Sequence, residues 1–210
     1  MARTGISSAE RRQALVAAAE QELRALEARG VNMAGNAMSP VVLVKGELNE
    51  EERAGGELLA GADGAALRAS LLRLGWSPED FCALSAVAGA TGGAAGSSGA
   101  DGAATGAVPL PAGEPLPPEL FREALEALDP EAVILLDEVA AEAMREAYAD
   151  ALAIIEDFNT AMLMPGLVAR VLGRRVLALG GFEAALGNGA AEKQRMWAYL
   201  KQLPPEGAPY

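Results

Sequence analysis

The sequence predicts an α/β protein, built as a three-layer α/β/α sandwich around a mainly parallel sheet of about four strands. Short aliphatic runs, each bounded by Gly, Pro or an acidic residue, recur at 41–45, 81–87, 132–136 and 175–179. Uninterrupted apolar runs of this length are typical of strands that are buried on both faces. Segments with helical spacing separate these runs, and strands that alternate with helices favour a parallel sheet covered on both sides.

The helices are predicted in order along the chain. Their expected ranges are 7–29, ended by Gly30, then 64–74, 119–128, 138–155 with Asp137 as its N-cap, and 190–203. Residues 156–172 are ambiguous, with enough apolar residues for a partial helix.

The length of 210 residues suits one substantial core, so a single domain is expected over residues 1–210. Within it, residues 88–116 are Gly, Ala, Ser, Thr and Pro with almost no large apolar side chain. Such a segment cannot bury enough surface to offset the entropy of ordering it. A flexible Gly/Ala-rich loop is therefore expected at 88–116.

The residue inventory excludes several kinds of chemistry. The chain has no histidine, which removes Ser-His-Asp and Cys-His catalysis, imidazole acid–base chemistry and the usual zinc hydrolase sites. Its single cysteine, Cys82, excludes an internal disulfide and an iron–sulfur cluster held by one chain. No metal and no cofactor are expected.

Charge and hydropathy restrict the partners and the compartment. The net charge is −12, and acidic residues dominate 91–166, whereas 167–210 has a basic bias. Strong nucleic-acid binding is not expected, except through that C-terminal segment. No apolar run approaches the ~20 residues of a membrane span, and the N-terminus lacks a signal core, so the protein is expected in the cytoplasm, without membrane contact.

A functional crevice is expected at the carboxyl end of the 41–45 strand, where open α/β folds usually bind ligands. Gly46 and Glu47 follow that strand directly. Glu47 is a candidate pocket carboxylate; the alternative is a solvated acid or one hydrogen-bonded to a helix N-terminus. Asp137 ends another strand and could pair with Glu47 for acid–base work or a divalent metal, although helix capping alone also explains it.

Two glycine-containing loops complete the candidate crevice. Gly61 and Gly64 precede a helix and could cradle an anion with backbone amides, or could serve tight turns. Gly180 and Gly181 follow the last strand and could present Phe182 as an apolar wedge, or Phe182 could pack in the core.

Several stretches, taken in order, resemble the uracil-DNA glycosylase superfamily, especially its bacterial iron–sulfur branch and uncharacterised relatives. The matching stretches are Val41 to Val44, Gly46 to Glu50, Gly56 to Gly64, Leu74 to Trp76, Val133 to Met144, Gly173 to Leu177 and Lys193 to Lys201. The resemblance implies the glycosylase fold, in which a uracil base is flipped out of the stack and held in the crevice.

The functional positions depart from the family pattern. Leu59 matches the Phe that stacks on uracil, Ser85 matches the Asn that reads its edge, and Gly180-Gly181 stand in place of the catalytic His-Pro. The four cluster cysteines have no counterparts, and Glu47 alone of the first motif is kept. Loss of a single well-placed electrostatic donor commonly costs ~2.7–4 kcal/mol of transition-state stabilisation.

These departures favour a catalytically degenerate glycosylase-like protein that acts as a binding or interaction module. Its partner would be another protein or a small ligand. The alternative is a divergent DNA glycosylase or other hydrolase in which Glu47, together with Asp137, activates water.

Overall fold

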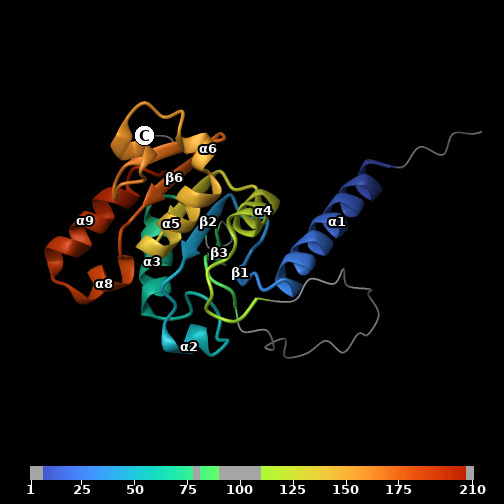
Figure 1. The fold of residues 1–210 in the computed structure, drawn as a ribbon, viewed down its shortest axis with the longest axis horizontal. Coiled ribbons are helices and arrows are strands. Elements are labelled where there is room, and N and C mark those ends of the chain that lie inside the picture. The colour runs from blue at the N-terminus through green and yellow to red at the C-terminus, as the bar shows by residue number, and fades with distance from the viewer. Residues whose placement is uncertain (1–6, 78–80, 90–109, 207–210) are drawn as a thin grey trace, which may run out of the picture.

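The computed structural model describes residues 7–77, 81–89 and 110–206, which form a mixed α/β fold around a six-stranded mixed sheet (Figure 1). The strands are β1 Met33–Gly35, β2 Val41–Lys45, β3 Phe81–Ser85, β4 Ala132–Leu135, β5 Val168–Val171 and β6 Arg174–Ala178. Their order across the sheet is β1-β3-β2-β4-β6-β5.

The four strands expected from the sequence lie together in the centre of the sheet. β3, β2, β4 and β6 pair in parallel, so that Val42 of β2 lies between Cys82 of β3 and Val133 of β4. Their carboxyl ends therefore meet at one edge of the sheet, as expected for a crevice at this position.

The prediction of about four strands is wrong, because two further strands pair antiparallel at the edges. β1 has three residues, too few to show a periodicity. β5 is joined to β6 by a two-residue turn at Leu172 and Gly173, whose φ angles are 48° and 88°. Positive φ at both central positions suits a tight hairpin. Such turns usually contain Asn, Asp or Gly at these positions, so Leu172 does not indicate this hairpin in the sequence.

Helices cover both faces of the sheet. They are α1 Ser8–Ala28, α2 Glu50–Arg53, α3 Ala62–Arg73, α4 Pro118–Leu128, α5 Glu138–Ala147, α6 Ala149–Leu152, α7 Phe158–Ala161, α8 Phe182–Gly187 and α9 Ala190–Leu200. Side chains of β2 alternate between the two apolar cores. Val42 and Val44 join the core beneath α4 and α5, whereas Val41 and Leu43 join the core beneath α3, α8 and α9.

Two further expectations, for residues 138–155 and for the loop after Gly181, are corrected, and the partial helix expected within 156–172 is present together with a strand. The helix expected over 138–155 is two helices, α5 and α6, that meet at Tyr148, where φ is −121°. Residues 156–172 hold a short helix, α7, and also the strand β5. A helix, α8, begins immediately after Gly181, where the sequence suggested a loop.

The loop predicted at 88–116 lies largely outside the described residues, since 90–109 are not among them. Its two described ends are held together by backbone hydrogen bonds. Ala88 N–H donates to the Glu114 carbonyl at 2.7 Å, and Leu116 N–H donates to the Ala86 carbonyl at 3.0 Å.

Among the residues that the structure describes, no helix has the length and apolar content that crossing a membrane requires. The longest, α1, has 21 residues and extends away from the sheet, with Leu26 near its end buried (Figure 1).

Candidate functional site

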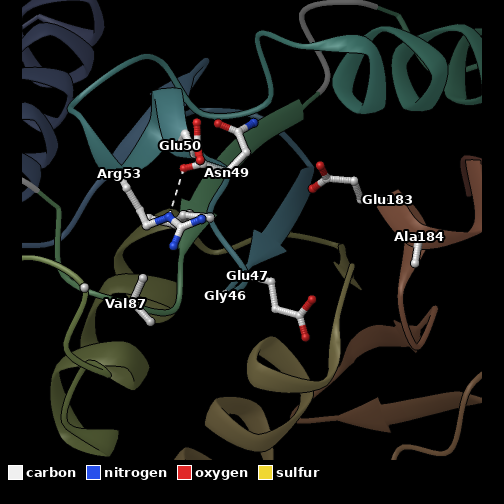
Figure 2. A pocket seen from close by; sticks show the side chains of 10 residues that line it. Gly46, Glu47, Asn49, Glu50, Arg53, Val87, Glu183 and Ala184 are labelled. Carbon is white, nitrogen blue, oxygen red and sulfur yellow. Dashed lines mark hydrogen bonds between the residues drawn. The ribbon is translucent and has the colours of Figure 1, made fainter. Parts of the chain in front are cut away.

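An open pocket of about 750 Å³ lies beyond the carboxyl end of β2 (Figure 2). It is lined by Gly46, Glu47, Leu48, Asn49, Glu50, Arg53, Val87, Gly113, Glu183 and Ala184. The predicted crevice therefore exists, with Gly46 and Glu47 in its wall. Glu47 comes from the end of β2 and Glu183 from α8, so the pocket joins segments that are far apart in the sequence.

Lys45, the last residue of β2, lies beside this pocket and is only 2% exposed. Its Nζ lies 2.7 Å from Asp63 Oδ2 in α3, 2.9 Å from Glu52 Oε2 in α2 and 3.1 Å from Glu183 Oε2 in α8. Glu52 and Asp63 are buried as well, whereas Glu183 is exposed. We call these four residues the Lys45 cluster. It connects three helices of the crevice region to the central strand.

The charges of the Lys45 cluster reinforce one another. Burial by itself lowers the pKa of Lys45, but the hydrogen bonds that its ammonium group donates to Asp63, Glu52 and Glu183 outweigh this effect and raise the pKa above its ordinary value. Burial by itself raises the pKa of Asp63, but the hydrogen bond and charge of Lys45 hold it below its ordinary value. Lys45 is therefore an ammonium ion at neutral pH, and it lacks the free amine that a lysine nucleophile needs.

Glu52 also holds the loop that forms one wall of the pocket. Its carboxylate accepts hydrogen bonds from the Asn49 N–H at 2.9 Å and the Leu59 N–H at 2.8 Å. The Asn49 side chain in turn accepts from the Glu52 N–H, which completes a capping box at the start of α2. One buried carboxylate thus fixes both ends of the segment 49–59.

Asp137 is buried and engaged by three backbone groups. Its Oδ1 accepts from Ala140 N–H at 2.9 Å, which caps α5, and its Oδ2 accepts from Gly46 N–H at 2.8 Å and Glu47 N–H at 3.0 Å. The structure thus brings Asp137 and Glu47 together, but through the backbone of Glu47. The Glu47 side chain is exposed and faces the pocket.

The candidate glycines are explained by close packing. A Cβ at Gly46 would lie 2.5 Å from Val139 Cβ, and one at Gly64 would lie 1.8 Å from the Leu59 carbonyl oxygen. Gly61 is the N-cap residue of α3. Tight packing therefore accounts for Gly46 and Gly64 without a bound anion.

Leu59 and Ser85, which match the family's two uracil-contacting positions, are buried away from the pocket. Leu59 is 1% exposed, with a φ of 56°, and it belongs to the core beneath α3. Ser85 is fully buried, and its hydroxyl donates to the Val87 carbonyl at 2.6 Å and accepts from the Val87 N–H at 3.1 Å. Neither side chain is part of the pocket lining.

Of the two interpretations of Phe182, core packing is what the structure shows. Phe182, the first residue of α8, is 4% exposed and belongs to the apolar core beneath α3, α8 and α9. Gly180 and Gly181 have φ angles of 69° and 112°, and the N–H groups of Gly181 and Phe182 both donate to the Leu136 carbonyl. This turn directs Phe182 inward, so it is not available as a wedge.

Sequence reasoning missed the Lys45 cluster. A lysine at the end of an otherwise aliphatic strand is one available signal, because a buried ammonium requires acidic partners. The spacing of Asn49 and Glu52, typical of a capping box, is another. Asp63 and Glu183 come together with Lys45 only in the folded chain.

Among the described residues, no group of three or more His, Cys, Asp and Glu side chains is arranged to hold a metal ion.

No protein-family model matches the sequence, and a search of curated proteins also gives no match.

Proposed function

We propose that this protein is a catalytically degenerate relative of the uracil-DNA glycosylase superfamily that binds a ligand in its crevice without excising a base. The four parallel central strands, with helices on both faces, agree with the architecture that the motif resemblance implies. The crevice lies at their carboxyl ends, where this class of fold binds ligands.

The observation that carries the proposal is the engagement of Asp137. Its carboxylate already accepts three backbone N–H groups at 2.8–3.0 Å, so it is committed to holding α5 against the loop after β2. A general base needs a lone pair directed at its substrate or water. Lys45 is likewise paired with carboxylates on three elements. The open pocket is thus retained, while the buried charged groups beside it, Lys45 and Asp137, are engaged in holding the fold together.

The charge of the pocket indicates the kind of ligand. Its wall carries the acids Glu47, Glu50 and Glu183 against one base, Arg53, whose Nε donates to the Asn49 carbonyl at 3.3 Å (Figure 2). A net negative wall repels phosphates and favours a neutral or cationic small molecule. The polar groups at the rim can supply hydrogen bonds to orient it.

The alternative is a divergent glycosylase or other hydrolase that uses Glu47 to activate water. The observation that favours it is the position of Glu47, an exposed carboxylate in the wall of an open pocket. In this alternative, Glu47 is the single catalytic carboxylate, because the carboxylate of Asp137 is already engaged by three backbone N–H groups.

A single-turnover assay separates the two. The protein is placed in excess over a uracil-containing single-stranded oligonucleotide, and abasic sites are scored for the wild type and Glu47→Gln. We expect no excision by either protein. Excision by the wild type that is lost in Glu47→Gln would establish the enzyme instead.

Ligand binding is then measured by the shift in melting temperature with a panel of nucleobases, nucleosides and alkylamines. Ala184→Trp is the control, because Ala184 is exposed in the pocket wall and a large side chain there fills the space. A ligand of the crevice should stabilise the wild type but not Ala184→Trp. An equal shift in both proteins would place that ligand elsewhere.

A further inference from the structure

A short stretch around α7 exposes four large apolar side chains to solvent. Their exposed fractions are 83% for Ile154, 73% for Phe158, 40% for Met162 and 49% for Met164. Single exposed apolar residues are ordinary on protein surfaces, but a group of them within eleven consecutive positions is typical of an interaction site. We call these four residues the α7 patch.

The α7 patch is held on a compact, hydrogen-bonded turn. Met162 N–H donates to the Phe158 carbonyl at 2.9 Å, and Met164 N–H donates to the Asn159 carbonyl at 3.0 Å. Leu163, between the two methionines, is 1% exposed and anchors the turn in the core. The exposed side chains are therefore presented by an ordered backbone, which lowers the entropic cost of binding.

The turn begins with its own cap. Asp157 Oδ2 accepts from both the N–H and the hydroxyl of Thr160 at 2.7 Å. This places a carboxylate immediately before Phe158, at the edge of the α7 patch.

Acidic residues dominate the chain around the α7 patch. Residues 138–167 contain six acids, Glu138, Glu142, Glu146, Asp150, Glu156 and Asp157, and one base, Arg145. Two bases from outside this stretch lie nearby: Arg122 of α4 pairs with Asp150 at 3.0 Å, and Arg170 is exposed on β5, which contacts α7. Arg145 connects the acidic face of α5 to the patch, since it donates to the Met162 carbonyl at 3.2 Å while pairing with Glu138 at 2.5 Å and with Glu142. The only base of this stretch is therefore already neutralised.

We infer that the α7 patch is a docking surface for a cationic amphipathic helix of a partner protein. The apolar face of such a helix would cover Phe158 and the methionines, whose flexible side chains adapt to different apolar surfaces. Its Lys and Arg side chains would meet the surrounding carboxylates, which increases the association rate and selects against acidic partners.

Charge also argues against other occupants. A two-fold contact with a second copy of this chain would bring the same acidic rims face to face. Nucleic acid would meet carboxylates in place of the cations that it requires. The α7 patch shares no residue with the pocket lining, so this inference stands apart from the proposed crevice function.

The test uses the full chain and two fluorescent peptides of identical Leu/Lys composition, one ordered as an amphipathic helix and one scrambled. Fluorescence anisotropy gives the Kd of each. The wild type should bind the amphipathic peptide at least about tenfold more tightly than the scrambled peptide, because only the former presents one apolar face. The double variant Phe158→Ser, Met162→Ser should lose about tenfold in affinity for the amphipathic peptide.

Leu72→Ser is the matched control, because Leu72 of α3 is 48% exposed and lies outside the α7 patch; its affinity should equal that of the wild type. Phe158→Ser alone is the second variant if the melting temperature of the double variant falls. Equal binding of the two peptides, or unchanged affinity in the patch variants, would overturn the inference. A concentration-dependent dimer that the patch variants abolish would overturn it too, since a second copy would then cover the patch.

Discussion

At the scale of single residues, Lys45 is the side chain on which the walls of the crevice converge. Its ammonium group is buried with two buried carboxylates, and a third carboxylate reaches it from the surface of α8. A buried ion pair contributes little net stability compared with apolar residues of the same shape, but removal of one partner leaves an uncompensated charge. Because removal of Lys45 would leave two buried carboxylates without a cation, a substitution at Lys45 tests the role of the cluster directly.

Lys45→Met should lower the free energy of unfolding by about 3–5 kcal/mol, because Glu52 and Asp63 would remain buried without a cation. Urea denaturation followed by circular dichroism measures the change. Glu183→Gln should cost less than about 1 kcal/mol, since Glu183 is 55% exposed and its pairing is screened by water.

Lys193→Met is the matched control, because Lys193 is exposed on α9. We expect its unfolding curve to match the wild type within about 0.5 kcal/mol. If Lys45→Met were equally neutral, the Lys45 cluster would not hold the crevice together.

At the scale of secondary-structure elements, Asp137 joins the start of α5 to the end of β2. The carboxylate caps the helix and at the same time satisfies two backbone donors of the neighbouring strand end. Gly46 permits this contact, since any larger residue would collide with Val139. Two elements that are distant in the sequence are thereby fixed relative to each other at the base of the pocket.

Asp137→Ala should therefore cost more than an ordinary helix cap, whose loss costs about 0.5–2 kcal/mol. Each buried N–H left without an acceptor adds about 1–3 kcal/mol. Asp157→Ala, which removes the exposed cap of α7, is the comparison and should stay within the ordinary range. Similar losses in both variants, measured by urea denaturation, would show that the bonds to Gly46 and Glu47 add nothing.

At the scale of the whole molecule, the Lys45 cluster makes stability depend on pH. The pKa of Asp63 is lowered in the folded state, so its contribution is present above the ordinary value of 3.8 and is lost as the pH falls through the folded value. The pKa of Lys45 is raised, so its contribution is fully present below the ordinary value of 10.5 and is lost as the pH rises through the folded value. Between these limits the contribution of the pair is constant.

Urea midpoints measured from pH 6 down to pH 2.5 should fall steeply for the wild type. Asp63→Asn should be less stable at pH 6 and should show a shallower fall with acid, because it has no carboxylate to protonate at this position. An identical slope in both proteins would assign the acid sensitivity to other carboxylates.

The central elements of the fold could be predicted because local sequence specifies them. Four aliphatic runs became β2, β3, β4 and β6, and Gly30 and Asp137 marked a helix end and a helix start as expected. Burial on both faces requires an apolar side chain at every position of a central strand, and this leaves a continuous pattern. β1 has only three residues and β5 is partly exposed, so they leave no such pattern.

Part of the candidate site could also be predicted from local sequence, and part could not. The position of the crevice and the place of Gly46 and Glu47 in its wall followed from the end of one strand. The buried orientations of Leu59, Ser85 and Phe182 did not, since a side chain beside a loop can turn either way until its neighbours are in place.

The sequence by itself determined the parallel centre of the sheet, the location of the crevice and the chemistry that a chain without histidine lacks. The tertiary structure decided the roles of the charged residues. Lys45, Glu52, Asp63 and Glu183 come from four separate elements, and Asp137 meets Gly46 across 91 positions of the chain. Which charged residues pair depends on the distance between them and on their burial in the folded chain. Local sequence specifies neither that distance nor that burial.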